Sequence, residues 1–220
     1  NFLKGGHVII WTTTPWTIPA NRALVYSSKI KYSVVQVGQD SENFQNKNIV
    51  IASELINRVS KECNFEDFKI LKEFMGNEFK NTICCHPFIN LGYDYDVPML
   101  EGDFVTLEQG TGIVHAAPSH GPDDFNLCLK HGLKAPDTLN DAGIYSDVIP
   151  FFSGMHIFKA DDLIIEKLSE SKNLLGNGKL QHSFPHSWRS KAPLVYRATP
   201  QWFISMEKKD LRKKALAAID

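Results

Sequence analysis

The sequence of 220 residues has few cysteines and no pattern that would pair them. Its four cysteines, Cys63, Cys84, Cys85 and Cys128, form no Cys-x-x-Cys pair and no recognisable disulfide framework. The adjacent Cys84 and Cys85 are poor partners for each other, because a bridge between neighbours is strained. We therefore expect free thiols in a reducing compartment.

Long hydrophobic runs and an excess of positive charge are also lacking. No apolar stretch approaches the roughly 18 residues of a membrane-spanning helix, and no secretory signal peptide is recognisable, so we predict no membrane partner. The 24 Lys and Arg are balanced by 25 Asp and Glu, giving a net charge of −1. This balance argues against a surface that wraps nucleic acid non-specifically, although a pocket for one nucleic-acid end remains compatible with it.

Several catalytic signatures are missing as well. The glycines form neither a phosphate-binding loop nor a dinucleotide fingerprint, and no Gly-x-Ser-x-Gly elbow is present. If the chain is a hydrolase, the nucleophile is expected to be water positioned by the protein. The chain begins at Asn1 and ends at Asp220 in what reads as a running helix, so we expect it to be a piece of a longer protein.

The pattern of apolar residues predicts short strands mixed with helices, without a regular alternation of the two. Strands are expected at 7–14, 32–37, 48–52, 68–74, 82–88 and on both sides of a turn within 104–117. A loop is expected at 91–103, and helices at 53–63, 118–132, 160–172 and 206–219. This order predicts an α+β fold with a barrel-like, mainly antiparallel β-sheet core and short flanking helices.

A cluster of hydroxyls stands at the end of the first expected strand, in the stretch WTTTPWT at 11–17. Threonines are common in strands, so an ordinary polar strand end is one interpretation. In the other interpretation Pro15 breaks the alternation of faces and lets Thr12, Thr14 and Thr17 face one pocket. Short hydroxyls there can donate and accept hydrogen bonds without adding charge.

A second candidate site lies in the stretch GTGIVHAAPSHGPDDF at 110–125. Asp124 falls in the first turn of the expected helix, where the helix dipole favours a carboxylate, and the same position can also present that carboxylate to a ligand's ammonium group. His115, His120 and Asp124 could instead be metal ligands, although their spacing matches no established zinc pattern. Cys84, Cys85 and His86 are a second, weaker metal candidate, for which packing within a strand is the better explanation.

Together these two stretches resemble the two signature segments of the editing domain of isoleucyl-tRNA synthetase. This domain is the large connective insertion in the catalytic fold of a class I enzyme. The stretches EGDFVTLEQGTG and SWRSKAPLVYRATPQWFISM agree with the same family, and the resemblance covers most of the chain. Thr14 stands where the valyl and leucyl relatives carry arginine, and His115 is present where they lack histidine. Ser187 departs from the cysteine frequent in bacterial relatives.

The resemblance implies a function for the threonine hydroxyls, which is to line a pocket for a misattached amino acid. Isoleucine and valine differ by one methylene, which is worth about 1–3 kcal/mol in a pocket, a magnitude for which isoleucine-specific synthetases are themselves the standard example. A second, smaller site must therefore hydrolyse valyl products. The resemblance implies catalytic roles for Asp124, Thr12, Thr13 and His115. It implies substrate binding by Thr14, Thr17, Asn21, Trp11 and His120, with Asp124 holding the α-amino group and His115 limiting side-chain size.

The same resemblance implies the wider organisation. Residues 1–183 would form the editing domain, of the class I Val/Ile/Leu-tRNA synthetase type. Residues 184–220 would form a return segment toward the catalytic domain, packed on the editing domain. The expected partners are the acceptor end of tRNA(Ile) and valine or valyl-adenylate, in a cytoplasmic monomer. Basic residues expected near the tRNA are Arg189, Lys191, Arg197 and the run from Lys208 to Lys214.

No metal or cofactor is expected for editing. ATP and magnesium would serve only the full-length synthetase, because the HIGH and KMSKS signatures of aminoacylation are absent. Three alternatives remain open at this point. The chain could be a module that binds aminoacyl-tRNA ends without turnover, a metal-dependent hydrolase that uses His115, His120 and Asp124, or a free-standing editing protein.

Overall fold

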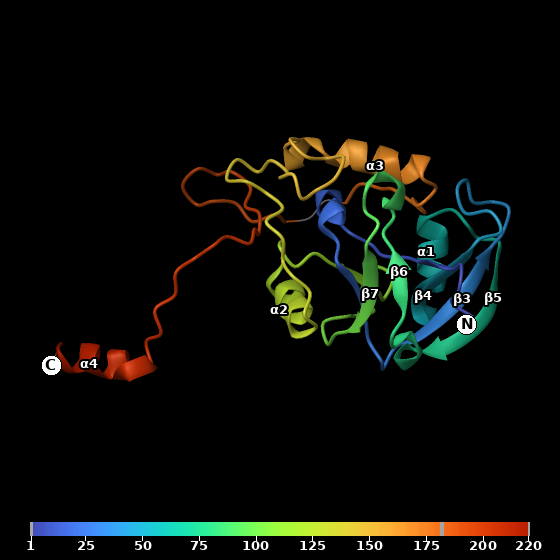
Figure 1. The fold of residues 1–220 in the computed structure, drawn as a ribbon. Helices are drawn as coiled ribbons and strands as arrows, with labels where there is room; N and C mark the ends of the chain where they lie inside the picture. Colours follow the sequence, from blue (N-terminus) through green and yellow to red (C-terminus); the bar gives the residue numbers. More distant parts are fainter. Residues whose placement is uncertain (1, 181–182, 220) are drawn as a thin grey trace.

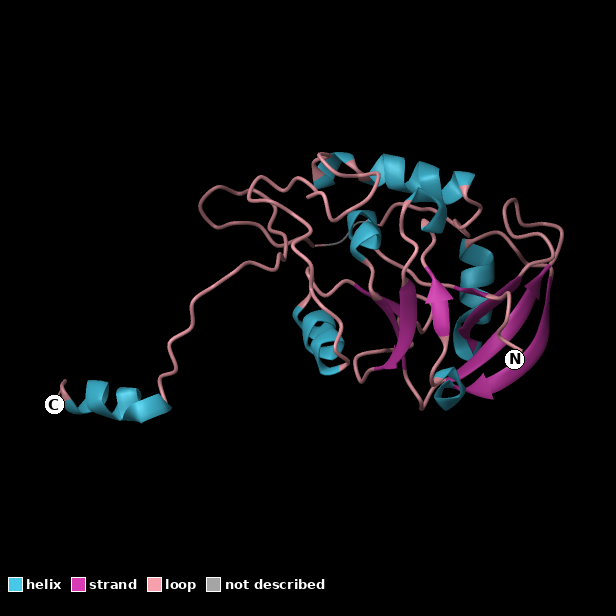
Figure 2. Ribbon diagram, in the orientation of Figure 1, coloured by secondary structure: helices cyan, strands magenta, loops and turns pink. Residues whose placement is uncertain are grey.

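A computed structural model describes residues 2–180 and 183–219, and it contains two four-stranded sheets (Figures 1 and 2). The first sheet has the order β1-β4-β3-β5 and the second the order β6-β7-β2-β8. The strands are β1 (His7–Val8), β2 (Ala23–Tyr26), β3 (Lys31–Val37), β4 (Asn48–Ala52), β5 (Phe68–Met75), β6 (Ile83–Cys85), β7 (Asp96–Glu101) and β8 (Val114–Ala116).

Short helices flank the two sheets and connect their strands (Figure 2). The α-helices are α1 (Ile56–Glu62), α2 (Pro122–Lys130), α3 (Asp161–Glu170) and α4 (Leu211–Ala217). The 3₁₀ helices are η1 (Pro15–Ala20), η2 (Ser53–Leu55), η3 (Gly76–Phe79), η4 (Ile89–Leu91), η5 (Ile157–Lys159) and η6 (Lys208–Asp210). In the described part of the chain, no helix is both long and apolar enough to cross a bilayer.

The α+β class predicted from the sequence is confirmed, but the predicted barrel-like sheet is two separate sheets in the described residues. The strand β4 and the three helices α1, α2 and α3 fall inside the predicted ranges, and β3 begins one residue before its predicted range, at Lys31. Within the described residues the strands close no barrel and remain two sheets. Each sheet also contains one parallel pair, β1 with β4 and β2 with β7, so the core is mixed.

The strand predicted at 7–14 is wrong beyond Val8. Ile9 still donates one backbone hydrogen bond to Val50 O, at 3.1 Å. After that the backbone bends, because the Thr14 amide donates to the Thr12 side chain (3.0 Å) rather than to a neighbouring strand. Hydroxyl side chains that capture nearby amides in this way compete directly with the hydrogen bonds of a sheet.

The loop predicted at 91–103 is also wrong, because it contains β7 despite Pro98. The amide of Met99 donates to Thr82 O on the side of β6, at 3.0 Å. Successive amides point to opposite sides of a strand, so the missing N–H of Pro98 falls on the side of β2. Residues of β7 and β2 are paired only from Met99 onward, and no hydrogen bond is lost there.

The strand predicted before the glycine turn, within 104–108, does not form. Only β8 follows the turn, where it pairs with β2. The Arg58 guanidinium donates to the carbonyls of Glu108 (2.7 Å) and Gly110 (3.1 Å) at this point. These carbonyls face a side chain of α1 and have no partner strand.

The C-terminal segment touches the body of the protein over a short stretch and then leaves it. Ala198 N donates to Ser119 O (2.9 Å), and Arg197 donates to Leu139 O (3.0 Å). Beyond this contact the chain extends away to α4, and Trp202 is 99 % exposed (Figure 1). Of the return segment predicted at 184–220, the part near Arg197 and Ala198 therefore packs on the domain. Asn1 and Asp220, the outer limits of the two predicted ranges, lie outside the described residues.

Candidate functional site

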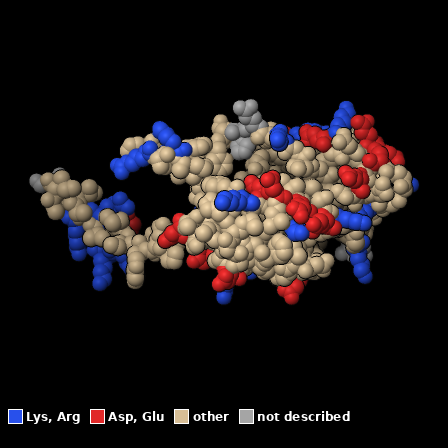
Figure 3. Space-filling model, turned by 90° about the horizontal axis from the view of Figure 1, so that it is seen from above, with Lys and Arg blue, Asp and Glu red and all other residues tan. Residues whose placement is uncertain are grey.

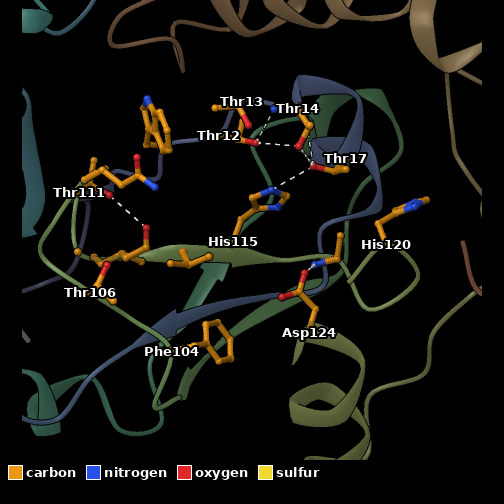
Figure 4. A pocket seen from close by; sticks show the side chains of 17 residues that line it. Thr12, Thr13, Thr14, Thr17, Phe104, Thr106, Thr111, His115, His120 and Asp124 are labelled. Carbon is orange, nitrogen blue, oxygen red and sulfur yellow. Dashed lines mark hydrogen bonds between the residues drawn. The ribbon is translucent and has the colours of Figure 1, made fainter. Parts of the chain in front are cut away.

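One cavity of about 390 Å³ brings together most of the residues singled out from the sequence (Figure 4). Two stretches far apart in the chain form it, one around the threonine cluster and one around the glycine turn and the start of α2. The predicted residues that line it are Trp11, Thr12, Thr13, Thr14, Thr17, His115, His120 and Asp124. Asn21 is absent from this lining, so its predicted contact with substrate gains no support from the geometry.

The threonine wall, defined as residues 11–17, is held by its own hydroxyls. Thr17 Oγ1 donates to Thr14 O at 2.8 Å and lies 3.5 Å from Thr14 Oγ1, which is itself 3.3 Å from Thr12 Oγ1 (Figure 4). Thr13 is exposed, and its hydroxyl has no hydrogen-bond partner among the described residues. The wall therefore presents a fixed chain of three hydroxyls and one that is free to bind a ligand.

The body of the protein supports the threonine wall from behind through η1. Trp16 N donates to Asp161 Oδ1 of α3 at 2.9 Å, and the Tyr145 hydroxyl donates to Trp16 O. Buried His86 bonds Ile18 O through Nε2, at 3.0 Å. Because Phe88 N donates to Nδ1 of the same ring, Nε2 carries the proton, and burial lowers the pKa of His86 to about 4. This wall is thus tied to the core as well as to itself.

His115 of β8 is a neutral imidazole in this site. Its Nε2 lies 3.1 Å from Thr17 Oγ1. The single proton of Thr17 is already donated to Thr14 O, so His115 Nε2–H must be the donor. Burial, with a smaller contribution from nearby His120, lowers the pKa of His115 to about 4. Its Nδ1 is buried and has no partner in the described part of the chain.

Asp124 is a carboxylate without a counter-ion. Its Oδ2 accepts a hydrogen bond from Ala117 N at 2.9 Å, which links the end of β8 to the first turn of α2 (Figure 4). No salt bridge joins it to a basic residue among those described. Burial raises its pKa, the Ala117 amide opposes that rise, and neighbouring Asp123 adds to it. A half-buried carboxylate of this kind favours a bound cation.

His120 lines the cavity, but both of its ring nitrogens are engaged elsewhere. Nδ1–H donates to Tyr196 O (3.0 Å), and Nε2 lies 2.9 Å from Thr138 Oγ1, so the ring serves to hold the return segment. Residues 2–180 and 183–219 contain no group of three His, Cys, Asp or Glu side chains that could hold a metal ion. His86, the centre of the second metal candidate, is likewise engaged at both nitrogens, and Cys85 beside it is exposed.

The glycine turn, defined as residues 107–112, forms a second wall of the cavity beside Trp11, and its side chains were not singled out from the sequence. Gly110 and Gly112 both have positive φ angles, of 76° and 75°. A Cβ on Gly112 would lie 2.4 Å from the Ala52 Cβ, so only glycine fits. The Gly-x-Gly pattern was the one available signal for this wall. Lining residues missed from the sequence are Phe104, Thr106, Gln109, Thr111, Ile113 and Val114.

Basic side chains gather at the end of the chain, and over the rest of the surface they are scattered among acidic side chains in the view of Figure 3. Lys208, Lys209 and Arg212 to Lys214 lie in or next to η6 and α4, away from the body. Arg197, predicted to lie near the tRNA, is paired with Asp141 (2.6 Å) in the free chain. Arg189 stacks over Trp188, with 4.6 Å between its Cζ and the ring centre.

Asn21 follows η1 and is buried. Its backbone carbonyl accepts a hydrogen bond from the Tyr95 hydroxyl at 2.9 Å, and its side-chain Oδ1 has no partner among the described residues. Asn21 therefore joins the threonine wall to β2 from inside the protein.

No family model matches the chain, but it is similar in sequence to curated proteins and in fold to solved structures. The chain is 62 % identical over 218 residues to an isoleucine–tRNA ligase of Pelagibacter ubique (strain HTCC1062), covering 99 % of this chain and 24 % of that protein. It is 45 % identical over 233 residues to an isoleucine–tRNA ligase of Gluconobacter oxydans (strain 621H), again covering 99 % and 24 %. The chain thus spans about a quarter of the length of these curated relatives.

Solved structures show the same fold at low sequence identity. The crystal structure of GlLeuRS-CP1 matches with a TM-score of 0.62 and 12 % identity, covering 82 % of this chain and 88 % of that one. The editing domain of the P. falciparum cytosolic leucyl-tRNA synthetase matches with a TM-score of 0.57 and 14 % identity, covering 78 % and 80 %. The chain therefore belongs to the isoleucine–tRNA ligase family, and it has the editing-domain fold of the class I synthetases.

Proposed function

We propose that the cavity is a proofreading site, which hydrolyses the ester joining valine to the acceptor end of tRNA(Ile) and rejects isoleucine by size. The observation that carries this proposal is the meeting of one unpaired carboxylate, Asp124, with a wall of uncharged hydroxyls in a single cavity. An α-amino acid ester carries one ammonium group and one small side chain, and it needs these two features to be bound. The membership of the isoleucine–tRNA ligase family supports this assignment.

In the proposed complex Asp124 binds the ammonium group of valine, and the side chain of valine faces the threonine wall and His115. Trp11 is 40 % exposed at the edge of the cavity, where its ring can stack on the terminal adenine of the tRNA. His120 contributes the shape of the cavity, because its ring nitrogens are already used. The size limit follows from the distance between the threonine wall and the glycine turn.

In the proposed reaction a water molecule attacks the ester carbonyl carbon. A new carbon–oxygen bond forms, the ester bond to the ribose oxygen breaks, and that oxygen takes up a proton, which releases valine and the free tRNA end. Thr12, Thr13 and Thr14 hold the water and the ester by hydrogen bonds. His115 is not assigned the role of the base, because its Nε2–H donates to Thr17 and burial lowers the pKa of the imidazole to about 4, which makes it a weak base. Positioning of the reactants therefore supplies most of the acceleration.

For the longer protein we propose the acceptor end of tRNA(Ile) as partner, in a cytoplasmic monomer, with valyl-adenylate as an additional substrate. Editing would need neither metal nor cofactor. ATP and magnesium would belong to the aminoacylation part of the synthetase.

The test is the deacylation of valyl-tRNA(Ile) by the 220-residue chain, with isoleucyl-tRNA(Ile) as the matched control and each reaction run with and without EDTA. We expect selective loss of valine that is indifferent to EDTA. Loss of activity on chelation would favour the metal-dependent alternative. Binding of either tRNA by the folded chain without any turnover would favour the non-catalytic module.

A further inference from the structure

We propose that Arg58, a residue of α1 outside the cavity, is a positioning residue that sets the size limit of the site by clamping the glycine turn. This inference rests on the proposed function, because the size limit matters only if the cavity receives an amino acid side chain. Arg58 does not line the cavity, and the sequence analysis did not single it out.

The clamp consists of two hydrogen bonds from one guanidinium group. Arg58 Nη1 donates to Glu108 O at 2.7 Å, and Nη2 donates to Gly110 O at 3.1 Å. The Nε of the same group lies 3.9 Å from Glu62 Oε1, one turn further along α1. A guanidinium is planar and presents its donors in a fixed fork, so it can hold two carbonyls at a set separation.

The glycine turn needs this support at one end only. Its far end is tied three times: Thr111 O accepts from Ala52 N (2.9 Å), Thr111 Oγ1 donates to Ile9 O (2.6 Å), and the Tyr32 hydroxyl donates to Gly112 O (2.9 Å). Within the part of the chain that the structure describes, Arg58 makes the only hydrogen bonds to Glu108 and Gly110. Glu108 and Gln109 are exposed, and glycine at Gly110 adds backbone freedom.

The clamped end is the part of the turn that faces the threonine wall. A Cβ built on Gly110 would lie 3.6 Å from both Cβ and Cε3 of Trp11, so the turn and the Trp11 ring are in contact distance of each other. Release of Glu108 and Gly110 would let the turn move away from Trp11 and widen the cavity. Discrimination between valine and isoleucine depends on a single methylene, so a small displacement of this wall changes it.

The experiment compares Arg58→Ala with Lys61→Ala, a control that removes one positive charge from an exposed position of the same helix. The binding of two adenosine analogues, one carrying a valyl and one an isoleucyl amide in place of the ester, is measured for the 220-residue chain and both variants. Backbone dynamics of Gly110 and Thr111 are measured by NMR. Deacylation of valyl- and isoleucyl-tRNA(Ile) is measured in parallel.

For Arg58→Ala we expect a loss of about tenfold in the preference for the valyl over the isoleucyl analogue, since one methylene accounts for about 10–200-fold. The loss should come chiefly from tighter binding of the isoleucyl analogue, and Gly110 should become more mobile. Arg58→Lys should recover part of the preference, because an ammonium replaces the fork by a single donor group. Lys61→Ala should resemble the wild type in every measurement.

Unchanged preference and unchanged Gly110 dynamics in folded Arg58→Ala would overturn the clamp. Increased mobility of Gly110 with an unchanged preference would also overturn the inference, because the turn would then not set the size limit. Failure of the proposed function gives a different pattern: the wild-type chain would bind neither analogue in this cavity and would deacylate neither tRNA.

Discussion

The two walls of the cavity are built in different ways. The threonine wall is held by hydrogen bonds among its own hydroxyls and by a 3₁₀ helix whose residues Trp16 to Ala20 are buried. The glycine turn contributes mainly backbone and is held by groups that come from other elements, namely Arg58, Tyr32 and Ala52. The threonine wall therefore supplies hydroxyl groups that can bind a ligand, whereas the glycine turn supplies mainly the backbone surface that bounds the cavity.

The contrast shows how one cavity can hold its hydrogen-bonding groups in fixed positions while its width depends on residues outside it. Three linked hydroxyls and a neutral His115 are positioned by hydrogen bonds to one another, none of which comes from the glycine turn. A Gly-x-Gly turn has no side chains of its own at Gly110 and Gly112, so its position depends on residues elsewhere. Substitutions on the first wall should change the reaction rate, and substitutions behind the second should change selectivity.

The largest effect should come from Asp124→Asn. The amide keeps an oxygen that can accept from Ala117 N but loses the charge that we assign to the substrate ammonium. We expect deacylation of valyl-tRNA(Ile) to fall about 100- to 1,000-fold, the range for one lost partner of a buried charge pair. Steady-state kinetics of the variant against wild type measure this loss. Asp123→Asn, the neighbouring exposed carboxylate, is the control and should stay near wild type.

The support behind the threonine wall should be sensitive to acid. The folded-state pKa of His86 is about 4, below the unfolded value of 6.5, so the unfolded chain binds the proton first as pH falls. The stability that neutral His86 provides is present above pH 6.5 and is lost between pH 6.5 and about 4, by about 3 kcal/mol.

Denaturant unfolding at several pH values measures this loss. The variant His86→Gln, whose amide can still donate toward Ile18 O, should show a shallower fall in the free energy of unfolding than the wild type. Parallel curves for the two proteins would mean that His86 does not carry the effect.

Thr17→Val tests whether hydroxyls hold the first wall. The substitution keeps the shape and removes the bonds to Thr14 O and His115. Leaving buried polar groups unsatisfied costs about 1–3 kcal/mol, so the deacylation rate should fall about tenfold or more. Thr106→Val on the opposite side of the cavity should change the rate less than about threefold, because Thr106 has no hydrogen bond among the described residues. Equal losses in the two variants would mean that the hydrogen bonds of Thr17 are not what the reaction rate depends on.

The smallest expected effect is that of pH on kcat/KM for deacylation near neutral pH. Because the pKa of His115 lies near 4, the plot of log kcat/KM against pH from 5.5 to 8 should show no break near 6.5. The matched variant is His115→Gln. A break in the wild type that disappears in this variant would show that His115 titrates as a catalytic base.

Much of this arrangement could be predicted from the sequence. The acidic first turn at Asp124 and the apolar pattern of β3 are local signals, and the structure confirms the elements that they predict. The threonines and His115 were candidates from their own stretches, and only a resemblance linked these two stretches, which lie about 100 residues apart. Their meeting in one cavity follows from the pairing of β2 with β8, which no local pattern specifies.

The parts that could not be predicted depend on contacts between distant elements. The bend after Val8 comes from the bond between the Thr14 amide and the Thr12 hydroxyl, which competes with the sheet. Strand β7 forms despite Pro98, because the missing amide falls where no partner is needed. Arg58 carries no motif at all, and only its place on α1 beside the glycine turn reveals a role.

The central claim is that one amino acid binds between these two walls. The most direct measurement is a structure of the 220-residue chain with the valyl amide analogue of adenosine. The expected result places the ammonium group within hydrogen-bond distance of Asp124 and the valine side chain between the threonine wall and the glycine turn. Binding of the analogue elsewhere, or with its ammonium group away from Asp124, would contradict the claim.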